Sequence, residues 1–295
     1  MHRLPFFIVD VFAEAKYAGN QLAVFRGAGG LSTAEMQKIA REMNYSETTF
    51  LLSDEQQNGG YDVRIFTPEE EVPFAGHPTL GTAFVIQREI AGKAADTIVL
   101  NLRVGQIPVT FGGAGGENDL LWMKQNQPVF GETVDPQRIA KVLSIEEEDI
   151  DHRFPVQEVS TGLPSLIVPL NSLDAVKRSR TNRDEYFALV DKLQAKAILV
   201  FCPETYSSQN QVNARVFGDY FGVPEDPATG SANGNLAGYL VKHRYFGRTQ
   251  IDLRVEQGYE IGRPSLLYLR AEEKAAGIEV SVGGHVVMVA KGEFV

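Results

Sequence analysis

The sequence contains one strand, turn and helix pattern twice, and this repetition constrains the fold more than any other feature. The first copy reads RIFTPEEEVPFAGHPTLGTA over Arg64–Ala83, and the second reads RVFGDYFGVPEDPATGSANGNLAGYL over Arg215–Leu240. Each copy has an Arg-hydrophobic-Phe segment, an acidic turn with proline, and a glycine that opens a run of small residues. Two such copies predict a duplicated fold whose halves carry different side chains at matching places.

Weaker matches extend the repeat along the chain in the same order. Tyr17–Phe25 resembles Ser160–Leu170, and a helix-like stretch over Ser32–Met43 matches Thr181–Leu193. Preserved order over halves of about 130–150 residues indicates duplication of one domain-sized unit.

Residues Gly131–Pro155 match neither copy well, and we expect them to bridge the halves. They contain a short helix candidate, with Asp135 as N-cap and Pro136 at the first helical position. Earlier in the chain, Ser32 and Glu35 form an S-x-x-E pattern, which predicts a capping box at the start of another helix.

A different kind of helix follows each repeated glycine turn. Thr79–Ile86 and Ala232–Val241 are small or apolar on nearly all sides. A helix without a polar face belongs in the interior of a protein. We therefore expect one buried helix in each half, surrounded by the strands of that half.

Composition excludes several functional classes. The 295 residues are 43% hydrophobic and 22% charged, as in an ordinary soluble globular protein. The net charge of -10 and the lack of a basic run disfavour nucleic-acid binding. The N-terminal apolar stretch is short and broken by Asp10, so we expect neither a signal peptide nor a membrane span. The single cysteine, Cys202, lies in a strand-like run, which indicates a buried thiol and a reducing cytoplasm.

The repeated glycine turns are the first candidates for chemistry. His77 follows Gly76, and Ser231 follows Gly230, so both lie at the start of a buried helix. Glycine at such a place permits close backbone approach or a positive φ. The free N–H groups of a helix start, together with the helix dipole, form a site for a carboxylate. The simpler alternatives are an imidazole bonded to the backbone for His77 and an N-cap serine for Ser231.

Two carboxylates and an asparagine are further candidates. Glu47 precedes an apolar strand, where a glutamate is usually solvated, but the matching position in the second half is near Lys196. A carboxylate present in only one half suits a proton transfer by a single base. Asp226 lies five residues before Ser231, where it could orient His77 or a substrate amine, or simply form an Asx-turn. Asn20 is a turn residue or a substrate contact.

Other catalytic and binding patterns do not occur. The five histidines show no paired metal spacing, and there is no Cys-x-x-Cys. The glycine-rich TGSANGN lacks the features of a phosphate loop, and no G-x-S-x-G elbow is present. We therefore expect neither a metal nor an organic cofactor.

Three segments, NYSET, RIFTPEEEVPFAGHPTLGTA and GVPEDPATGSANGNLAGYL, resemble the signature regions of the PhzF, or phenazine biosynthesis-like, family. The resemblance is collinear over essentially the whole chain. It implies an α+β, diaminopimelate epimerase-like fold of two pseudo-symmetric halves, each a curved, mostly antiparallel sheet around a central helix, with the active site between them. It also implies a homodimer. The halves are expected to cover residues 1–118, completed by 283–295, and residues 119–282.

The resemblance assigns chemistry to the candidates above. It implies that Glu47 carries a proton in a pocket lined by His77 and Asp226, and burial is expected to raise the pKa of Glu47. Epimerases of this superfamily use two cysteines, which the turns here lack, so a two-thiol inversion is excluded. The implied substrate-binding residues are Asn20, Gly76, Thr229, Gly230 and Ser231.

The activity implied is that of a cofactor-independent isomerase. It would move a proton between carbons of a small, cyclic or unsaturated, amino or hydroxy carboxylic acid, in the manner of trans-2,3-dihydro-3-hydroxyanthranilate isomerase. The alternative is a non-catalytic binding or regulatory protein that keeps the site for an anionic metabolite.

Overall fold

The structure is a computed structural model. It describes residues 3–91, 95–113 and 119–295. The boundary expected between the halves involves residue 118, which lies outside the described residues.

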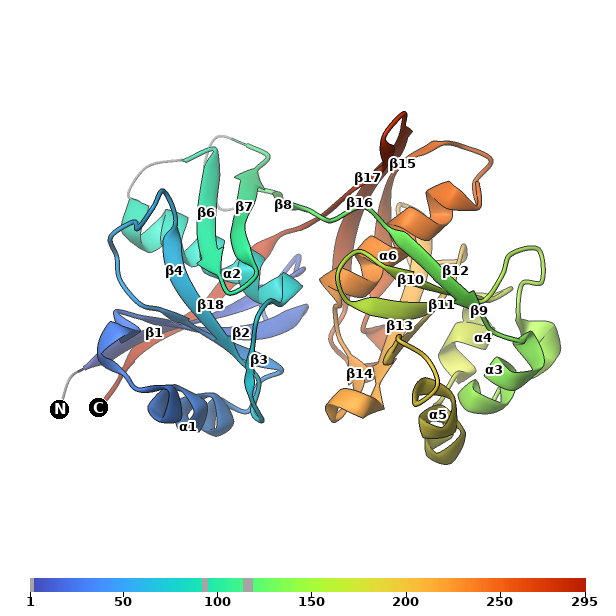
Figure 1. Cartoon of the computed structure of the whole chain (residues 1–295), viewed down its shortest axis with the longest axis horizontal. Helices are drawn as coiled ribbons and strands as arrows, with labels where there is room; N and C mark the ends of the chain where they lie inside the picture. Colours follow the sequence, from blue (N-terminus) through green and yellow to red (C-terminus); the bar gives the residue numbers. More distant parts are fainter. Residues whose placement is uncertain (1–2, 92–94, 114–118) are drawn as a thin grey trace. The chain divides into compact units, whose positions relative to one another are not determined.

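The chain forms two compact units (Figure 1). The first unit combines Met1–Met123 with the C-terminal Gly283–Val295, and the second is Lys124–Val282. The first unit is therefore discontinuous in sequence, because strand β18 (Val286–Phe294) pairs antiparallel with β1 (Leu4–Val11).

The remaining helices and strands of the first unit lie in the order β2 (Asn20–Arg26), α1 (Thr33–Met43), β3 (Glu47–Leu51), β4 (Tyr61–Phe66), β5 (Glu71–Val72), α2 (Gly76–Ile86), β6 (Thr97–Leu102), β7 (Gly105–Phe111) and β8 (Leu121–Lys124), which ends one residue beyond that unit. Those of the second unit are β9 (Val129–Thr133), α3 (Pro136–Leu143), β10 (Gln157–Ser160), β11 (Pro164–Pro169), α4 (Leu173–Arg178), α5 (Arg183–Val190), β12 (Ala197–Cys202), β13 (Val212–Gly218), β14 (Val223–Asp226), α6 (Gly230–Lys242), β15 (Gln250–Gln257), β16 (Ser265–Lys274) and β17 (Gly277–Gly284), whose last two residues belong to the first unit.

Strand pairing is the same in both units. In the first unit, β1–β2, β3–β4, β4–β5 and β6–β7 are antiparallel, whereas β2–β3 and β4–β6 are parallel. In the second unit, β10–β11, β12–β13, β13–β14 and β15–β16 are antiparallel, whereas β11–β12 and β13–β15 are parallel. The duplication predicted from the sequence is therefore confirmed at the level of topology.

The prediction that Gly131–Pro155 bridges the halves was wrong, because this segment lies entirely within the second unit. Its beginning lies in β9, which pairs antiparallel with β10 just as β18 pairs with β1. The two outer strands come from opposite ends of their units in sequence order. A comparison that follows chain order cannot align them.

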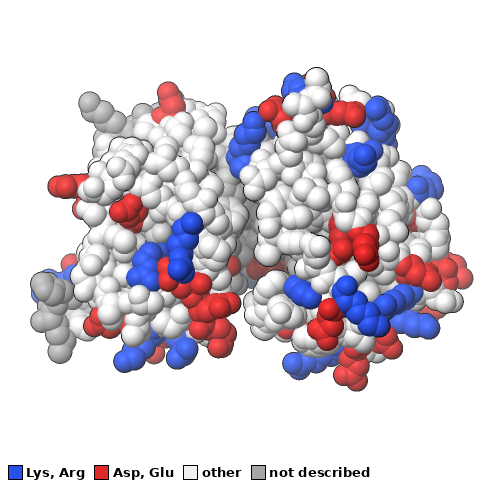
Figure 2. Space-filling model, in the orientation of Figure 1, with Lys and Arg blue, Asp and Glu red and all other residues white. Residues whose placement is uncertain are grey.

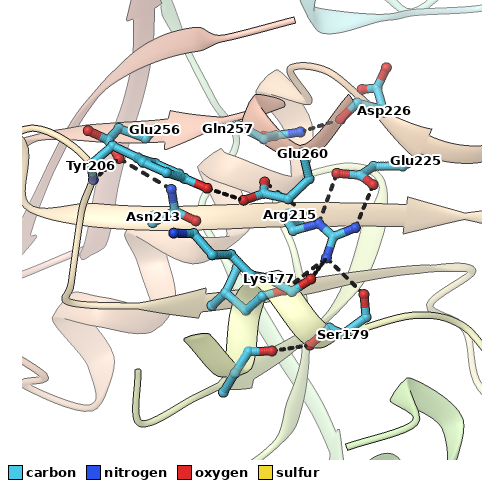
Figure 3. Close-up of polar contacts among 12 residues, drawn as sticks. Lys177, Ser179, Tyr206, Asn213, Arg215, Glu225, Asp226, Glu256, Gln257 and Glu260 are labelled. Atoms are coloured by element: carbon cyan, nitrogen blue, oxygen red, sulfur yellow. Dashed lines mark hydrogen bonds and ion pairs between the residues drawn. The ribbon is translucent and has the colours of Figure 1, made fainter. Parts of the chain in front are cut away.

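Strand register identifies residues that occupy equivalent places in the two units. Tyr61 faces Leu100 across the parallel β4–β6 pair, and Val212 faces Val255 across β13–β15. Arg64 lies three residues after Tyr61, and Arg215 lies three residues after Val212, so the two arginines are counterparts. Both arginines make a two-pronged salt bridge to a glutamate in the next strand. Arg64 binds Glu71, and Arg215 binds Glu225, the pair drawn in Figure 3.

The two central helices are buried, as their composition predicts. Every residue of α2 is buried, and in α6 only Ser231 and Lys242 are not. Helix α2 packs on β1, β2, β3, β6 and β7, and α6 packs on β10, β11, β12, β15 and β16. Burying an aliphatic or aromatic side chain contributes about 1.5–3 kcal/mol, so each helix stabilises its own unit.

The outer helices begin where their sequences predict. Ser32 and Glu35 form the expected capping box of α1, and Asp135 caps α3 with Pro136 in the first turn. Helix α5 is shorter than the predicted Thr181–Leu193. The side chain of Asn182 accepts a hydrogen bond from the backbone of Glu185 and sets the start of that helix.

Charged groups on the surface are of both signs. On the face drawn in Figure 2, Lys and Arg side chains lie among Asp and Glu side chains. Within the described residues, no helix is long and apolar enough to cross a membrane.

We predict that Gly81→Ala destabilises the first unit. A Cβ on Gly81 would lie 2.6 Å from Leu22 Cδ2 and 2.9 Å from Val11 Cγ2, so either these side chains or α2 itself would have to shift. Overpacking of this kind costs about 1–3 kcal/mol. Chemical denaturation measures the change, and Gly30→Ala is the control because a Cβ there meets no atom within 4 Å. Equal stability of the two variants would contradict the close packing.

Candidate active site

Glu47 and His77 meet in the first unit. Glu47 is the first residue of β3, and His77 is the second residue of α2. Glu47 Oε2 lies 3.6 Å from His77 Nε2, and that carboxylate oxygen is buried. The alternative prediction that Glu47 is a solvated residue at a strand edge is therefore wrong, because the backbone brings its carboxylate against a buried imidazole.

His77 is held neutral by its surroundings. The imidazole is 5% exposed, and its burial lowers the pKa of His77 from 6.5 to about 3. A hydrogen bond to the backbone of Gln21 raises the pKa of His77, as expected when the ring donates to a carbonyl, but by less than burial lowers it. Because Nε2 has no hydrogen-bond partner among the described residues, Nδ1 makes that bond. The neutral ring then presents the lone pair of Nε2 towards Glu47.

The other predicted residues of the first unit lie nearby in the fold. Asn20 is buried at the start of β2, two residues before Leu22, which faces Glu47 across the parallel β2–β3 pair. Gly76 is the first residue of α2. Its φ is not positive, so no left-handed conformation requires a glycine here.

The second unit brings together Asp226, Thr229, Gly230 and Ser231. Asp226 ends β14, and Thr229 Oγ1 donates a hydrogen bond of 2.5 Å to Asp226 Oδ2. Thr229 occupies the N-cap position of α6, Gly230 begins the helix, and Ser231 is partly exposed in its first turn. The alternative interpretation of Ser231 as an N-cap is therefore wrong.

Both central helices start without a side-chain cap. The N-cap residues Ala75 of α2 and Thr229 of α6 make no capping hydrogen bond. The other four α-helices of the described chain are each capped by a serine, an aspartate or an asparagine. The starts of α2 and α6 therefore have backbone N–H groups that no cap side chain occupies, which is the arrangement that favours an anion.

The two units carry different chemistry on the same backbone. Leu22 faces Glu47, and its counterpart Ser165 faces Ala197, so Ala197 takes the place of Glu47 in the second unit. Similarly, Ile65 faces Val72 and Val216 faces Asp226, so Val72 takes the place of Asp226. Each unit thus has a carboxylate at a place where the other unit has an aliphatic side chain.

The single cysteine lies in a strand, outside both glycine turns. Cys202 is buried in β12, and burial raises the pKa of its thiol to about 12. No group of three or more His, Cys, Asp or Glu side chains is arranged to hold a metal ion in the part of the chain that the structure describes.

The family model described as phenazine biosynthesis-like protein, PhzC-PhzF, matches residues 9–292. The chain belongs to the PhzF family. It is 36% identical to trans-2,3-dihydro-3-hydroxyanthranilate isomerase from Pseudomonas aeruginosa, over 96% of this chain and 96% of that protein. The crystal structure of a PhzF family phenazine biosynthesis protein from Bacillus anthracis has a TM-score of 0.91 and 26% identity, with both chains covered completely.

More distant similarity confirms the fold predicted for a PhzF protein. A hydroxyproline epimerase from Agrobacterium vitis has a TM-score of 0.64 at 9% identity, with 100% of this chain and 91% of that chain covered. The chain therefore has the α+β, epimerase-like fold of two similar halves. Its family membership and its relatives identify it as an isomerase.

Two groups of polar residues were missed from the sequence of this PhzF protein. The bridges Arg64–Glu71 and Arg215–Glu225 hold the strand before each helix start. Their signal was present, since each repeat begins with an arginine and has a glutamate in its acidic turn. Gln257, which bonds the turn beside Asp226, had only a weaker signal as a polar residue at the end of an otherwise alternating strand.

We predict that the neutrality of His77 makes stability depend on pH. The pKa of His77 is lower in the folded state than in the unfolded state, so below about 6.5 only the unfolded state takes up the proton. This group therefore stabilises the fold fully above pH 6.5, and that contribution is lost as the pH falls towards 3.

Urea denaturation between pH 7 and pH 5 tests this prediction. The free energy of unfolding should fall more steeply with acid in the wild type than in His77→Gln. His152→Gln is the control, because His152 is exposed and should leave the slope unchanged. Identical slopes for the wild type and His77→Gln would show that the imidazole is not held neutral.

Proposed function

We propose that this isomerase moves a proton between two carbons of a small cyclic or unsaturated carboxylic acid, with Glu47 as its single proton carrier. The observation that carries the proposal is the pair formed by Glu47 and the neutral His77, which has no counterpart in the second unit. The relative from Pseudomonas aeruginosa makes trans-2,3-dihydro-3-hydroxyanthranilate the first substrate to test.

The proposed reaction has two proton transfers on one face of the substrate. The carboxylate of Glu47 takes a proton from a carbon, and the electron pair of the broken C–H bond spreads into the neighbouring double bond. The carboxylic acid of Glu47, whose proton can exchange with solvent between the two transfers, then gives a proton to the carbon two atoms away, so that the double bond moves and no other reactant is consumed. General acid–base catalysis of this kind contributes about 10²–10⁴ in rate.

His77 supports the intermediate in which Glu47 holds the proton. The lone pair of its Nε2 faces Glu47 Oε2 and accepts a hydrogen bond from the protonated acid. An imidazolium at this place would instead hold Glu47 ionised and prevent proton uptake. The low pKa of His77 keeps the ring neutral, which lets Glu47 act as the base before the proton transfer and as the acid after it.

Substrate binding is assigned to the two uncapped helix starts and their neighbours. We propose that each helix start can bind a carboxylate and stabilise developing negative charge: the N–H groups at Gly76 with the amide of Asn20 in the first unit, and the N–H groups at Gly230 with the hydroxyl of Ser231 in the second. Asp226, supported by Thr229, is proposed to bind a substrate amine. A cytoplasmic homodimer that works without a cofactor completes the proposal.

We predict that Glu47→Gln abolishes proton transfer and keeps substrate binding. Gln preserves size and hydrogen bonding but cannot accept a proton, so turnover should fall by at least roughly 10²–10⁴. Exchange of a substrate C–H with deuterated water, followed by NMR, should fall equally, while ligand affinity changes far less. Glu42→Gln is the control, because Glu42 is exposed on α1.

Near-normal exchange in Glu47→Gln would falsify the one-base mechanism. Binding of small carboxylates by the wild type without any exchange would instead identify the non-catalytic binding protein. A panel of unsaturated amino and hydroxy acids in the exchange assay separates these outcomes without a guess about the product.

We predict a different pattern for His77→Ala and Asp226→Ala. Each residue shapes the site and contacts a group that the reaction needs, so affinity and turnover should weaken together. Steady-state kinetics with calorimetric measurement of binding distinguish this from the Glu47→Gln result. Unchanged affinity in both variants would remove them from the binding site.

A further inference from the structure

A buried glutamine controls the turn that carries Asp226. Gln257 ends β15 and is completely buried. Its Oε1 accepts hydrogen bonds from Thr229 N at 3.3 Å and from Asn233 Nδ2 at 2.8 Å. Its Nε2 donates to Asp226 O at 2.8 Å and to Thr229 Oγ1 at 3.2 Å, and Figure 3 shows the bond to Asp226. All four bonds of this side chain are made to the turn before α6 or to the first turns of that helix.

The donors and acceptors of these hydrogen bonds follow one another from Gln257 to the carboxylate of Asp226. The amide of Asn233 and the backbone N–H of Thr229 are donors, so they fix which end of Gln257 is the oxygen. Thr229 Oγ1 then accepts from Gln257 Nε2, which leaves its own proton for Asp226 Oδ2. Gln257, Thr229 and Asp226 therefore form one chain of hydrogen bonds.

The backbone beside Gln257 allows the close approach that these bonds require. Gly258 has φ 78°, and a Cβ there would lie 2.6 Å from Pro227 O and 2.4 Å from Arg263 O. The end of β15 thus lies directly against the turn that carries Asp226. On the other side of β14, Arg215 binds Glu225, and Figure 3 shows Glu225 and Asp226 directed away from each other.

The first unit has apolar residues at the places equivalent to this hydrogen-bond chain. Asp62 faces Asn101 in the first unit, and Asn213 faces Glu256 in the second, so Asn101 and Glu256 are counterparts. The next residues, Leu102 and Gln257, are therefore counterparts too. The counterparts of the other two members are also apolar: Ala75 for Thr229, as the N-cap residues of α2 and α6, and Val72 for Asp226. The salt bridges of Arg64 and Arg215, in contrast, are present in both units. Of the two units, only the one with the Asp226 carboxylate has this buried chain of hydrogen bonds, which indicates that the hydrogen bonds serve to hold that carboxylate.

We propose that Gln257 is a positioning residue, which holds the Asp226 carboxylate in its working orientation through the hydroxyl of Thr229. Gln257 is too deeply buried to touch a substrate, so it acts through Asp226. The inference rests on the proposed role of Asp226 in binding and turnover.

Gln257→Glu tests this with little change in shape. The new carboxylate keeps an acceptor for Thr229 N and Asn233 Nδ2 but cannot donate while ionised. The Thr229 hydroxyl then turns towards residue 257 and releases Asp226. We expect kcat/KM to fall about tenfold in the wild-type background and to change less than about twofold in an Asp226→Ala background, since residues that act through one another are not additive.

Asn235→Asp is the matched control. Asn235 is also completely buried in the second unit, and its amide also makes four hydrogen bonds, to Thr161 N, Thr161 Oγ1, Leu163 O and Ser165 Oγ. The same amide-to-carboxylate change should lower the melting temperature similarly. Its effect on kcat/KM should be equal in the wild-type and Asp226→Ala backgrounds.

A measurement independent of activity separates this inference from the proposed function. The side-chain ¹³Cγ signal of Asp226, assigned by its loss in Asp226→Asn, should shift in Gln257→Glu and stay in place in Asn235→Asp. If Gln257→Glu does not fold, Thr229→Val removes the connecting hydroxyl without adding a buried charge and should shift the same signal.

Two results would overturn the inference. An unshifted Asp226 signal in a folded Gln257→Glu or Thr229→Val protein overturns the inference, whatever the activity, and so do additive kinetic effects of Gln257→Glu and Asp226→Ala. A shifted signal together with full activity of Asp226→Ala supports the hydrogen-bond chain and overturns instead the role proposed for Asp226.

Discussion

Burial of one apolar helix in each unit is the constraint on which the rest of the structure depends. Helices α2 and α6 have no polar face, so the strands of each unit surround them and exclude water. Close approach of the strands requires small residues, such as Gly81, on the helix surface. The same burial brings the helix starts into the fold without serine or aspartate caps, and it sets uncovered backbone N–H groups beside the residues that differ between the units.

Duplication explains how one backbone provides two kinds of polar site. Features that hold the backbone are present twice, including the strand pairing and the salt bridges of Arg64 and Arg215. Features that can carry chemistry are present once. Glu47 has Ala197 at its equivalent place, and Asp226 has Val72. The salt bridges that hold the strands therefore recur in both units, whereas the carboxylates of Glu47 and Asp226 do not.

Desolvation is the physical effect that gives the Glu47–His77 pair its character. A histidine in water would be partly charged near neutral pH and would hold a neighbouring carboxylate ionised. Burial lowers the pKa of His77 so far that its ring stays neutral, and the backbone of Gln21 determines which nitrogen keeps its proton. The imidazole can then accept a hydrogen bond from a protonated carboxyl group.

The sequence by itself determined the duplication, the two buried helices, the caps Ser32 and Asp135, and the candidate residues of both turns, because these depend on periodicity and on neighbours along the chain. Only the tertiary structure decided the rest. The pairing of β9 with β10 and of β18 with β1 joins segments that chain order does not align. The contact of Glu47 with His77, and the bonds from Gln257 to the Asp226 turn, join residues about thirty positions apart. Such contacts follow from strand register and burial, which no local pattern of residues contains.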